Sequence, residues 1–461
     1  MFVYIDGYLQ IFMNGPLFTN LKTNMSILEK YSFKYCLKCD CQQFDGCKRY
    51  HGGLVNDFEP DLVENEWEIN HLANLRCTLN GCKSQIGEFP SMHWNRHTDY
   101  TEISTGIKEQ IIRRFRRKIP PVLTRAWIKF YDILCTFNLI NLDSNNVRVM
   151  FQCEAPGAFI NATNHFIKSR STKLNFEWIA NTLNPYYEQI DTLECISYDT
   201  FIREPDCYRN WFFGQSNKGN ILEDSYMDSL NDYLKNRFHS KENLIDDDGT
   251  FDLITGDGAF DCCHCFDSQE ESVFPLIKAE INISLKHLRH GGNLVVKFFT
   301  FFNCRTISLL YSLSNCFDKV SCYKPVASKK GNSEIYVICQ HFQRLIYVRN
   351  WKEKLNHSND LFIIGRQSIM DKFIEEISNI ASTLTNRQIV AINRNIQLYK
   401  SMTDKDEKEI KNFKYRLAKR FINEFQLFSI AESDQLAYPS AYTNPSHSHV
   451  FIEKLKKFHL F

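Results

Sequence analysis

Four ionisable residues, Lys129, Asp257, Lys297 and Glu334, stand at or near the ends of segments that we expect to border one cleft. Lys297 follows four apolar or neutral positions in a strand expected to be buried on both faces, where an unpaired ammonium group is costly. Asp257 lies between two glycines directly after another apolar strand. Two lysines and two carboxylates in one pocket indicate a site of chemistry.

The chemistry that suits this quartet is removal of a proton from an alcohol, such as a ribose 2′-hydroxyl, for in-line attack on a sulfonium methyl group. A lysine acts as the base only if its pKa falls toward neutrality, and both desolvation and a second cation lower it. We assign Lys297 as the base and Lys129 as the second cation. Asp257 and Glu334 would orient them, and the four groups would titrate as one coupled set.

Each member of the quartet also has a purely structural interpretation. Asp-Gly pairs are common in ordinary turns, which accounts for Asp257 without any chemistry. Lys297 can extend to solvent from a strand end. Lys129 can be one more charge in a basic patch.

Strands that alternate with helices must position these residues. The apolar pattern predicts strands at residues 146–153, 176–180, 193–196, 251–255, 293–299, 318–323 and 334–339. It predicts helices at residues 123–137, 158–168, 274–288, 304–314 and 403–425. The alternation indicates an α/β protein with a mostly parallel sheet. The last two strands are joined by a loop too short for a crossover, so they should pair antiparallel and bring Glu334 to the carboxyl edge of the other strands.

The turn after the first of these strands is a candidate ligand site. It reads CEAPGAF from Cys153 to Phe159, and Gly157 would let the backbone approach a ligand closely at the edge where such sheets bind their ligands. The helix N-terminus beyond it favours an anionic group such as a carboxylate. The pattern of a dinucleotide or triphosphate site is absent. An ordinary strand–helix turn would also use Pro-Gly.

Composition describes a soluble globular protein. The chain has 461 residues, 43% apolar and 24% charged, with a net charge of +1, so nucleic-acid affinity must come from a local patch. We see no secretory signal, and the 17 cysteines are expected to be reduced, in nucleus or cytoplasm. The longest apolar stretch is interrupted by Lys297 and is too short to span a bilayer.

The strongest charge bias lies between Lys108 and Lys129, with eight Lys or Arg and one Glu. The candidate RNA-binding residues in it are Arg113, Arg114, Arg116, Arg117 and Lys118. A charge run alone is more often a solvated face or a localisation signal. Its place beside the Lys129 helix favours binding of RNA phosphates.

The N-terminal hundred residues are expected to be an irregular extension. They contain Cys36, Cys39, Cys41, Cys47 and His51, which could hold zinc, although a structural site usually needs a second paired knuckle. We therefore favour free thiols and assign no metal. Residues 343–430 are expected to be a helical region, and residues 431–461 a mobile tail.

Five motifs, in this order, give the chain a family resemblance: CEAPGAFI, WIANTLNPYYE, TGDGAFDC, GGNLVVKFFTFF and KPVASKKGNSEIYVIC. Together with RAWIKFYDIL around Lys129, they resemble the FtsJ- or RrmJ-type 2′-O-ribose methyltransferases, most closely the eukaryotic enzymes of the second cap position. The resemblance covers residues 95–340 well. It implies a domain over residues 101–342 with a Rossmann-like class I methyltransferase fold, seven strands and one antiparallel strand.

The resemblance also implies a donor, an acceptor and residue roles. The donor would be S-adenosylmethionine and the acceptor the second transcribed nucleotide of capped mRNA. The catalytic roles carry over to the quartet, and donor binding to Gly157, Trp178, Asp199 and Asp257. Trp211, Tyr186 and Tyr187 are candidates for gripping the cap.

Two other functions stay open. One is an FtsJ-type methyltransferase of ribosomal or transfer RNA, and the other is a capped-RNA-binding protein that has lost catalysis. The family usually carries a second, inactive methyltransferase-like domain, and this sequence is too short to contain one.

Overall fold

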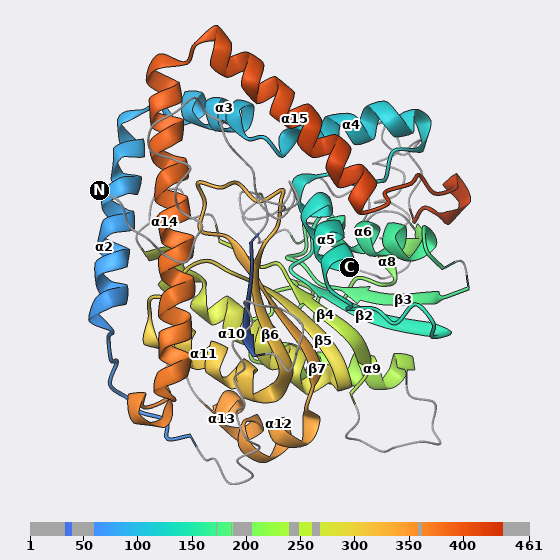
Figure 1. The fold of residues 1–461 in the computed structure, drawn as a ribbon. Coiled ribbons are helices and arrows are strands. Elements are labelled where there is room, and N and C mark those ends of the chain that lie inside the picture. The colour runs from blue at the N-terminus through green and yellow to red at the C-terminus, as the bar shows by residue number, and fades with distance from the viewer. Residues whose placement is uncertain are drawn as a thin grey trace.

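The structure is a computed structural model. It describes residues 33–38, 60–171, 173–185, 187, 205–238, 249–260, 268–357 and 362–436. These residues form one seven-stranded sheet with helices on both faces (Figure 1). The strands are β1 Phe33–Lys38, β2 Asn146–Gln152, β3 Asn175–Ala180, β4 Phe251–Gly256, β5 Leu288–Phe298, β6 Phe317–Lys324 and β7 Ile335–Phe342.

The strand order is β1-β6-β7-β5-β4-β2-β3. Strands β2 to β5 pair parallel, and β7 runs antiparallel between β5 and β6, as predicted. The chain goes from β2 outward to β3 and then returns to β4 on the other side of β2. This reversal is a topological switch point, where the carboxyl ends of parallel strands leave a crevice for ligands. The Rossmann-like α/β fold class is confirmed.

The seventh strand differs from the predicted one. β1 pairs antiparallel with β6 at the sheet edge, so two strands run against the rest instead of one. The strand predicted at residues 193–196 lies outside the described residues. The N-terminal segment was expected to be irregular because it lacks a sustained apolar period. A six-residue strand is too short to give a sustained period, and its place in the sheet depends on pairing with β6, which lies far away in the sequence.

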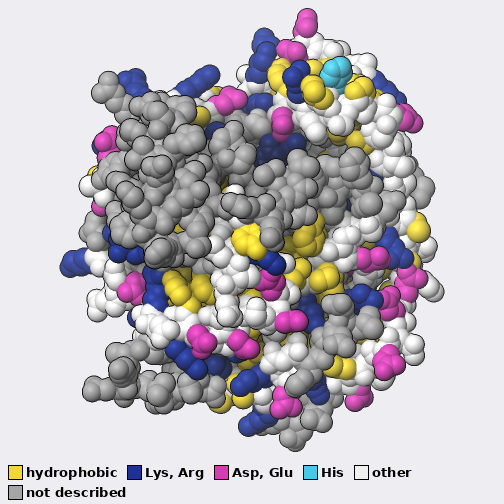
Figure 2. Space-filling model, turned by 180° about the vertical axis from the view of Figure 1, so that it is seen from behind, with side chains coloured by type: hydrophobic (Ala, Val, Ile, Leu, Met, Phe, Trp, Pro, Cys, Tyr) yellow, Lys and Arg dark blue, Asp and Glu magenta, His cyan; other side chains and the backbone are white. Residues whose placement is uncertain are grey.

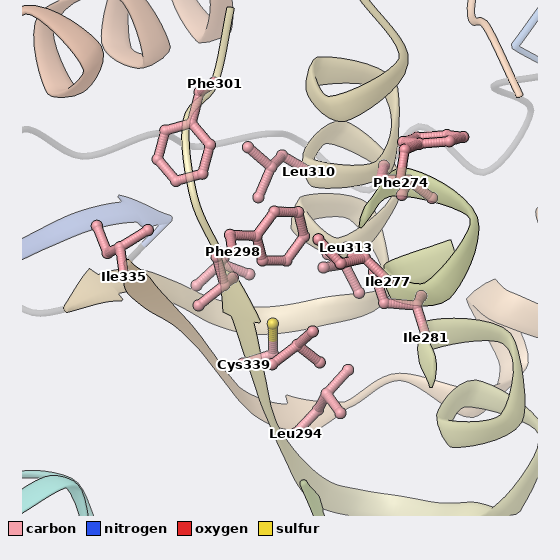
Figure 3. Close-up of a cluster of buried hydrophobic side chains, with 14 of the residues drawn as sticks. Phe274, Ile277, Ile281, Leu294, Phe298, Phe301, Leu310, Leu313, Ile335 and Cys339 are labelled. Carbon is pink, nitrogen blue, oxygen red and sulfur yellow. The ribbon is translucent and has the colours of Figure 1, made fainter. Parts of the chain in front are cut away.

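Two apolar cores lie on the two faces of the sheet. The helices α10 Gln269–His287 and α11 Cys304–Cys316 cover one face, and α5 Arg125–Thr136 and α6 Ala158–Lys168 cover the other. β5 supplies both cores by alternation: Leu294, Val296 and Phe298 face α10 and α11, as Figure 3 shows for Leu294 and Phe298. Val295 belongs to the opposite core. Lys297 has the same parity as Val295, so β5 presents it toward α5 and α6.

The N-terminal region is more regular than expected. It contains α2 Asn70–Ser84, η1 Gln85–Glu88, α3 Ser91–Thr101, α4 Thr105–Phe115 and η2 Arg116–Lys118. The prediction of an irregular segment up to residue 100 is therefore wrong for residues 70–101. Asn and Gly within α2 weaken its helical pattern, but Leu72 and Leu79 are fully buried in the α10–α11 core. Tertiary packing outweighs low helix propensity here.

The segment after β7 is helical, as predicted. It contains α12 Arg344–Asn350, α13 Lys352–His357, η4 Arg366–Ser368, α14 Asp371–Ser401 and α15 Asp404–Glu424. Thr403 and Asp406 form a capping box at the start of α15. Figure 1 shows α14 rising along the sheet and α15 turning across its upper edge toward α4. The helices α8 Pro205–Tyr208 and α9 Tyr226–Phe238 lie between β3 and β4.

The start of the predicted mobile tail is docked on α6. The η5 turn Glu432–Asp434 belongs to it, and the carbonyls of Phe428 and Asp434 accept hydrogen bonds from His165 and Asn164. Residues 437–461 lie outside the described residues, as do Cys39, Cys41, Cys47 and His51 of the zinc candidates.

The described residues show mixed charge on one face of the molecule, no helix that could span a membrane and no cluster of metal ligands. On the face shown in Figure 2, acidic and basic side chains are interspersed over the part that is not grey. In the described part of the chain, no helix is long and apolar enough to cross a bilayer. The same residues contain no group of three or more His, Cys, Asp or Glu that could hold a metal ion.

Candidate active site

Lys297 and Asp257 form a buried ion pair at the carboxyl edge of the sheet. Asp257 lies in the turn directly after β4, and Lys297 is the penultimate residue of β5, the next strand. The Lys297 Nζ lies 3.1 Å from Asp257 Oδ1 and donates to the Asp257 carbonyl oxygen at 2.6 Å. The two side chains are 8% and 18% exposed, so solvent screens the pair weakly.

Tyr336 completes this pair and was missed from the sequence. It lies opposite Lys297 in the β5–β7 register, and its hydroxyl donates to Asp257 Oδ1 at 2.9 Å. The alternation of side chains along a strand could have predicted it, because Tyr336 follows Glu334 by two residues and must share its face of the sheet. The phenol thus helps to fix the carboxylate that pairs with Lys297.

Lys129 and Glu334 form a second ion pair on the same rim. Lys129 projects from α5, whose first turn is capped by the Thr124 side chain, and its Nζ lies 2.7 Å from both carboxylate oxygens of Glu334. Glu334 directly precedes β7 and also accepts a hydrogen bond from Ser328 Oγ at 2.6 Å. Their side chains are only 11% and 12% exposed. All four predicted catalytic residues therefore meet in one buried cluster, as two ion pairs.

The charges of the cluster determine its protonation. Burial alone would raise the pKa of Glu334, but Lys129 and Lys297 outweigh it and lower that pKa to about 2. Burial lowers the pKa of Lys297, but the carboxylates of Asp257 and Glu334 outweigh that effect, so the net shift is upward. The expectation that the pKa of Lys297 falls toward neutrality is therefore wrong for the ligand-free protein. The physical reason is that Asp257, Glu334 and Glu280 lie near the ammonium group and favour its charged form more than burial disfavours it.

The turn after β2 lies next to Asp257. The Asp257 backbone N–H donates to the Gln152 carbonyl at 3.3 Å, which joins the ends of β2 and β4. Gly157 has a φ of +101°, a left-handed conformation that favours glycine, and it starts α6. The Glu154 carboxylate accepts from the Phe159 N–H at 2.7 Å and also from the Ile160 N–H. The chain's own carboxylate thus occupies the helix N-terminus, so the predicted site for a ligand carboxylate at these amides is not open.

Two buried acids lie near Asp257 and the turn after β2. Glu154 and Glu280 are 3% and 0% exposed, and Glu280, from α10, accepts from the Gly258 N–H at 2.9 Å. Burial, together with the Asp257 carboxylate, raises the pKa of Glu154 well above its usual value. Burial raises the pKa of Glu280 to about 8, against the opposing effects of Lys297 and the Gly258 amide. These raised pKa values oppose the ionisation of both acids, and a cationic ligand bound beside them would favour their ionised forms.

The remaining predicted donor and cap residues are less central. Trp178 lies within β3, two residues before its end, is 4% exposed and packs edge-on against Trp211 at 6.2 Å between ring centroids. Trp211 is 6% exposed, which places it in the apolar core and not at a cap-stacking position. The Lys218 ammonium nitrogen lies over the Tyr187 ring, 6.0 Å from its centroid. Asp199 and Tyr186 lie outside the described residues.

The predicted RNA-binding residues form part of a larger basic surface. Arg113 and Arg114 are exposed in the last turn of α4, and Arg116 and Lys118 are exposed in η2; the Arg117 side chain is not described. α15 crosses α4 so closely that a Cβ added at Gly106 would lie 2.7 Å from the Cβ of Lys414. The second half of α15 adds further Lys and Arg, and no acid, between residues 411 and 420: Lys411, Lys414, Arg416, Lys419 and Arg420. α4 also packs on α5, which carries Lys129.

Comparison with known proteins identifies relatives of most of the chain. Over 406 residues, the chain is 31% identical to cap-specific mRNA (nucleoside-2'-O-)-methyltransferase 2 of Pongo abelii, which covers 85% of this chain and 51% of that protein. It is 34% identical to the Drosophila melanogaster protein of the same name over 312 residues, 66% of this chain and 42% of that one. The chain thus spans about half the length of the curated relatives it matches.

A solved structure and a family model each match part of the chain. A ribosomal RNA methyltransferase structure from Plasmodium falciparum is 20% identical, with a TM-score of 0.32, over 48% of this chain and 98% of that one. The FtsJ-like methyltransferase family model matches residues 122–342, which contain all six of the predicted catalytic and described donor-site residues, the quartet among them. Residues 122–342 of this chain therefore form an FtsJ-like methyltransferase domain.

Proposed function

We propose that this chain is an S-adenosylmethionine-dependent mRNA cap methyltransferase that methylates the ribose 2′-hydroxyl of the second transcribed nucleotide. The observation that carries the proposal is the buried quartet, two lysine–carboxylate pairs at the switch point of the sheet. The name shared by the metazoan relatives supports the cap and the nucleotide.

The carboxyl edge of the sheet beside the quartet carries the residues that we expect to hold the donor. Gly157 gives the turn before α6 a position without a side chain, and the buried acids Glu154 and Glu280 lie beside Asp257. S-adenosylmethionine, when bound, supplies an electrophilic methyl group and a sulfonium positive charge. Gly157 and Asp257 would border it, and its positive charge would favour the ionised forms of the two buried acids, whose pKa values burial raises.

Lys297 is proposed as the acceptor of the hydroxyl proton. Asp257 holds its ammonium nitrogen through both its carbonyl and its carboxylate, and Tyr336 holds that carboxylate, so the position of Lys297 does not depend on a mobile surface side chain. The neighbouring carboxylates raise its pKa at rest, so Lys297 must lose its own proton before it can take one. Lys129, held by Glu334, contributes positive charge where the oxygen becomes negative.

The exposed basic residues of α4, η2 and α15 are proposed to contact the RNA phosphates. Their side chains form a surface on the helix that packs against α5, so RNA bound there would run toward Lys129. Such contacts position the strand without reading its sequence.

The experiment that tests the proposal maps the methylated nucleotide. Purified protein is incubated with labelled S-adenosylmethionine and three RNAs: a capped transcript with a methylated first nucleotide, its uncapped counterpart and a ribosomal RNA fragment. The proposal predicts label on the second nucleotide of the capped RNA only. Label on ribosomal RNA instead would favour the ribosomal alternative, and no label on any RNA would overturn the enzymatic proposal.

A further inference from the structure

The loop between β6 and β7, residues 325–334, ends at Glu334 and is held firmly by the methyltransferase domain. Lys324 Nζ donates to the Glu334 carbonyl at 2.7 Å and to the Asn332 carbonyl at 2.9 Å. The Val326 N–H donates to the fully buried Asp132 carboxylate at 2.7 Å. These bonds hold the backbone of Glu334 in place independently of the contact between its side chain and Lys129.

α14, which lies outside the FtsJ-like domain, holds the same loop through one side chain. The Gln388 Nε2 donates to the Gly331 carbonyl at 3.1 Å, and the Gln388 Oε1 accepts from Ser333 Oγ at 3.1 Å. Gln388 is 5% exposed, so water cannot readily replace either bond. The amide nitrogen and the amide oxygen of Gln388 therefore both bind residues that lie just before Glu334.

α3 and its C-terminal capping residue Glu102 also lie outside that domain and contact the same loop. Lys329 Nζ lies 2.9 Å from Asp99 Oδ1, and the Lys330 N–H donates to Glu102 Oε2 at 3.3 Å. α3 and α14 are joined by the Thr101 hydroxyl, which donates to Asn395 Oδ1 at 3.1 Å. Figure 1 shows this loop beneath α3, between α14 and α5.

We propose that Gln388 is a positioning residue for methyl transfer, and that α3 and α14 together hold the β6–β7 loop so that Glu334 meets Lys129. The catalytic geometry of the FtsJ-like domain thus depends on helices on both sides of it in sequence. The activity part of this inference rests on the proposed function. A misplacement of about 1 Å at a catalytic group costs on the order of 10²-fold in rate, so loss of this support should act on kcat.

The test compares two substitutions on α14 in the full chain. Gln388→Met keeps side-chain length and removes both hydrogen bonds to the loop. Ser382→Ala is the matched control, because Ser382 hydrogen-bonds His71 of α2 at 2.7 Å and does not contact the loop. Transfer to capped RNA, thermal unfolding and amide hydrogen exchange of residues 326–335 are measured for both variants and the wild type, well below their Tm.

Gln388→Met is expected to lower kcat about tenfold or more, with KM for both substrates within about twofold, and to speed exchange in the loop. Ser382→Ala is expected to leave kcat within about twofold at a similar Tm. An unchanged kcat or unchanged loop exchange in Gln388→Met would overturn the inference, and so would an equal loss of kcat in the control. Hydrogen exchange does not depend on activity, so a wild type without transfer would refute the proposed function and leave the loop contacts testable.

Discussion

The Glu334–Lys129 pair should make stability depend on pH in a way that one substitution removes. The pKa of Glu334 is about 2 in the folded protein, against an ordinary value of 4.5. This difference of 2.5 pKa units corresponds to about 3 kcal/mol of stability. Because the folded-state pKa is depressed, the contribution is complete above pH 4.5 and is lost as the pH falls toward 2. About 1 kcal/mol of it should be gone at pH 3.5.

Glu334→Gln removes this ionisation and leaves Lys129 buried without its counter-charge. Breaking a buried pair costs about 3–5 kcal/mol, so the variant should be less stable than the wild type by that amount at pH 7. The difference should shrink by about 1 kcal/mol at pH 3.5, because the wild type loses part of its advantage there. Urea unfolding followed by tryptophan fluorescence, at several pH values between 7 and 3.5, measures the difference.

A surface pair supplies the control. Arg148 and Glu177 lie 2.6 Å apart, but their side chains are 39% and 37% exposed, so Glu177→Gln should cost only about 0–1 kcal/mol. If the difference between wild type and Glu334→Gln is the same at pH 7 and pH 3.5, the depressed pKa and the buried pair are refuted together.

Two further predictions concern the chemistry and the RNA. Tyr336→Phe removes the hydrogen bond to the Asp257 carboxylate, and a hydrogen bond to a charged group is worth about 1.5–3 kcal/mol. Steady-state kcat should therefore fall at least about tenfold while the protein stays folded. A kcat within twofold of wild type would show that Asp257 needs no such support. Arg113→Ala combined with Arg114→Ala removes two exposed cations, so the slope of log affinity against log salt, measured by fluorescence anisotropy with capped RNA, should become shallower by about 1.4–1.8. An unchanged slope would place the RNA elsewhere.

The sequence was sufficient to predict the members of the quartet because a strand and the residues at its end can be recognised from a short stretch of the chain. Asp257 follows an apolar strand, Lys297 lies near the end of the next one, and the short loop before Glu334 required an antiparallel return. Their meeting at one rim then follows from the shared carboxyl edge. Tyr336 was within reach of the same reasoning, since it is cross-strand from Lys297.

The supporting residues were not predictable in this way. Glu280 lies in the middle of α10 and Gln388 in the middle of α14, where nothing in the local pattern distinguishes them from other polar helix residues. They reach the site only through packing between segments far apart in the chain. The same holds for the direction of the Lys297 pKa, which depends on which carboxylate pairs with which lysine.

The central claim is that Lys297 accepts the hydroxyl proton during methyl transfer. It is tested most directly by comparing wild type and Lys297→Ala for transfer of labelled methyl to capped RNA, with RNA affinity measured on the same samples. General-base catalysis contributes about 10²–10⁴-fold, so Lys297→Ala should lose at least about 10² in rate and keep its affinity for RNA. A variant that transfers methyl at a rate within tenfold of wild type would contradict the account.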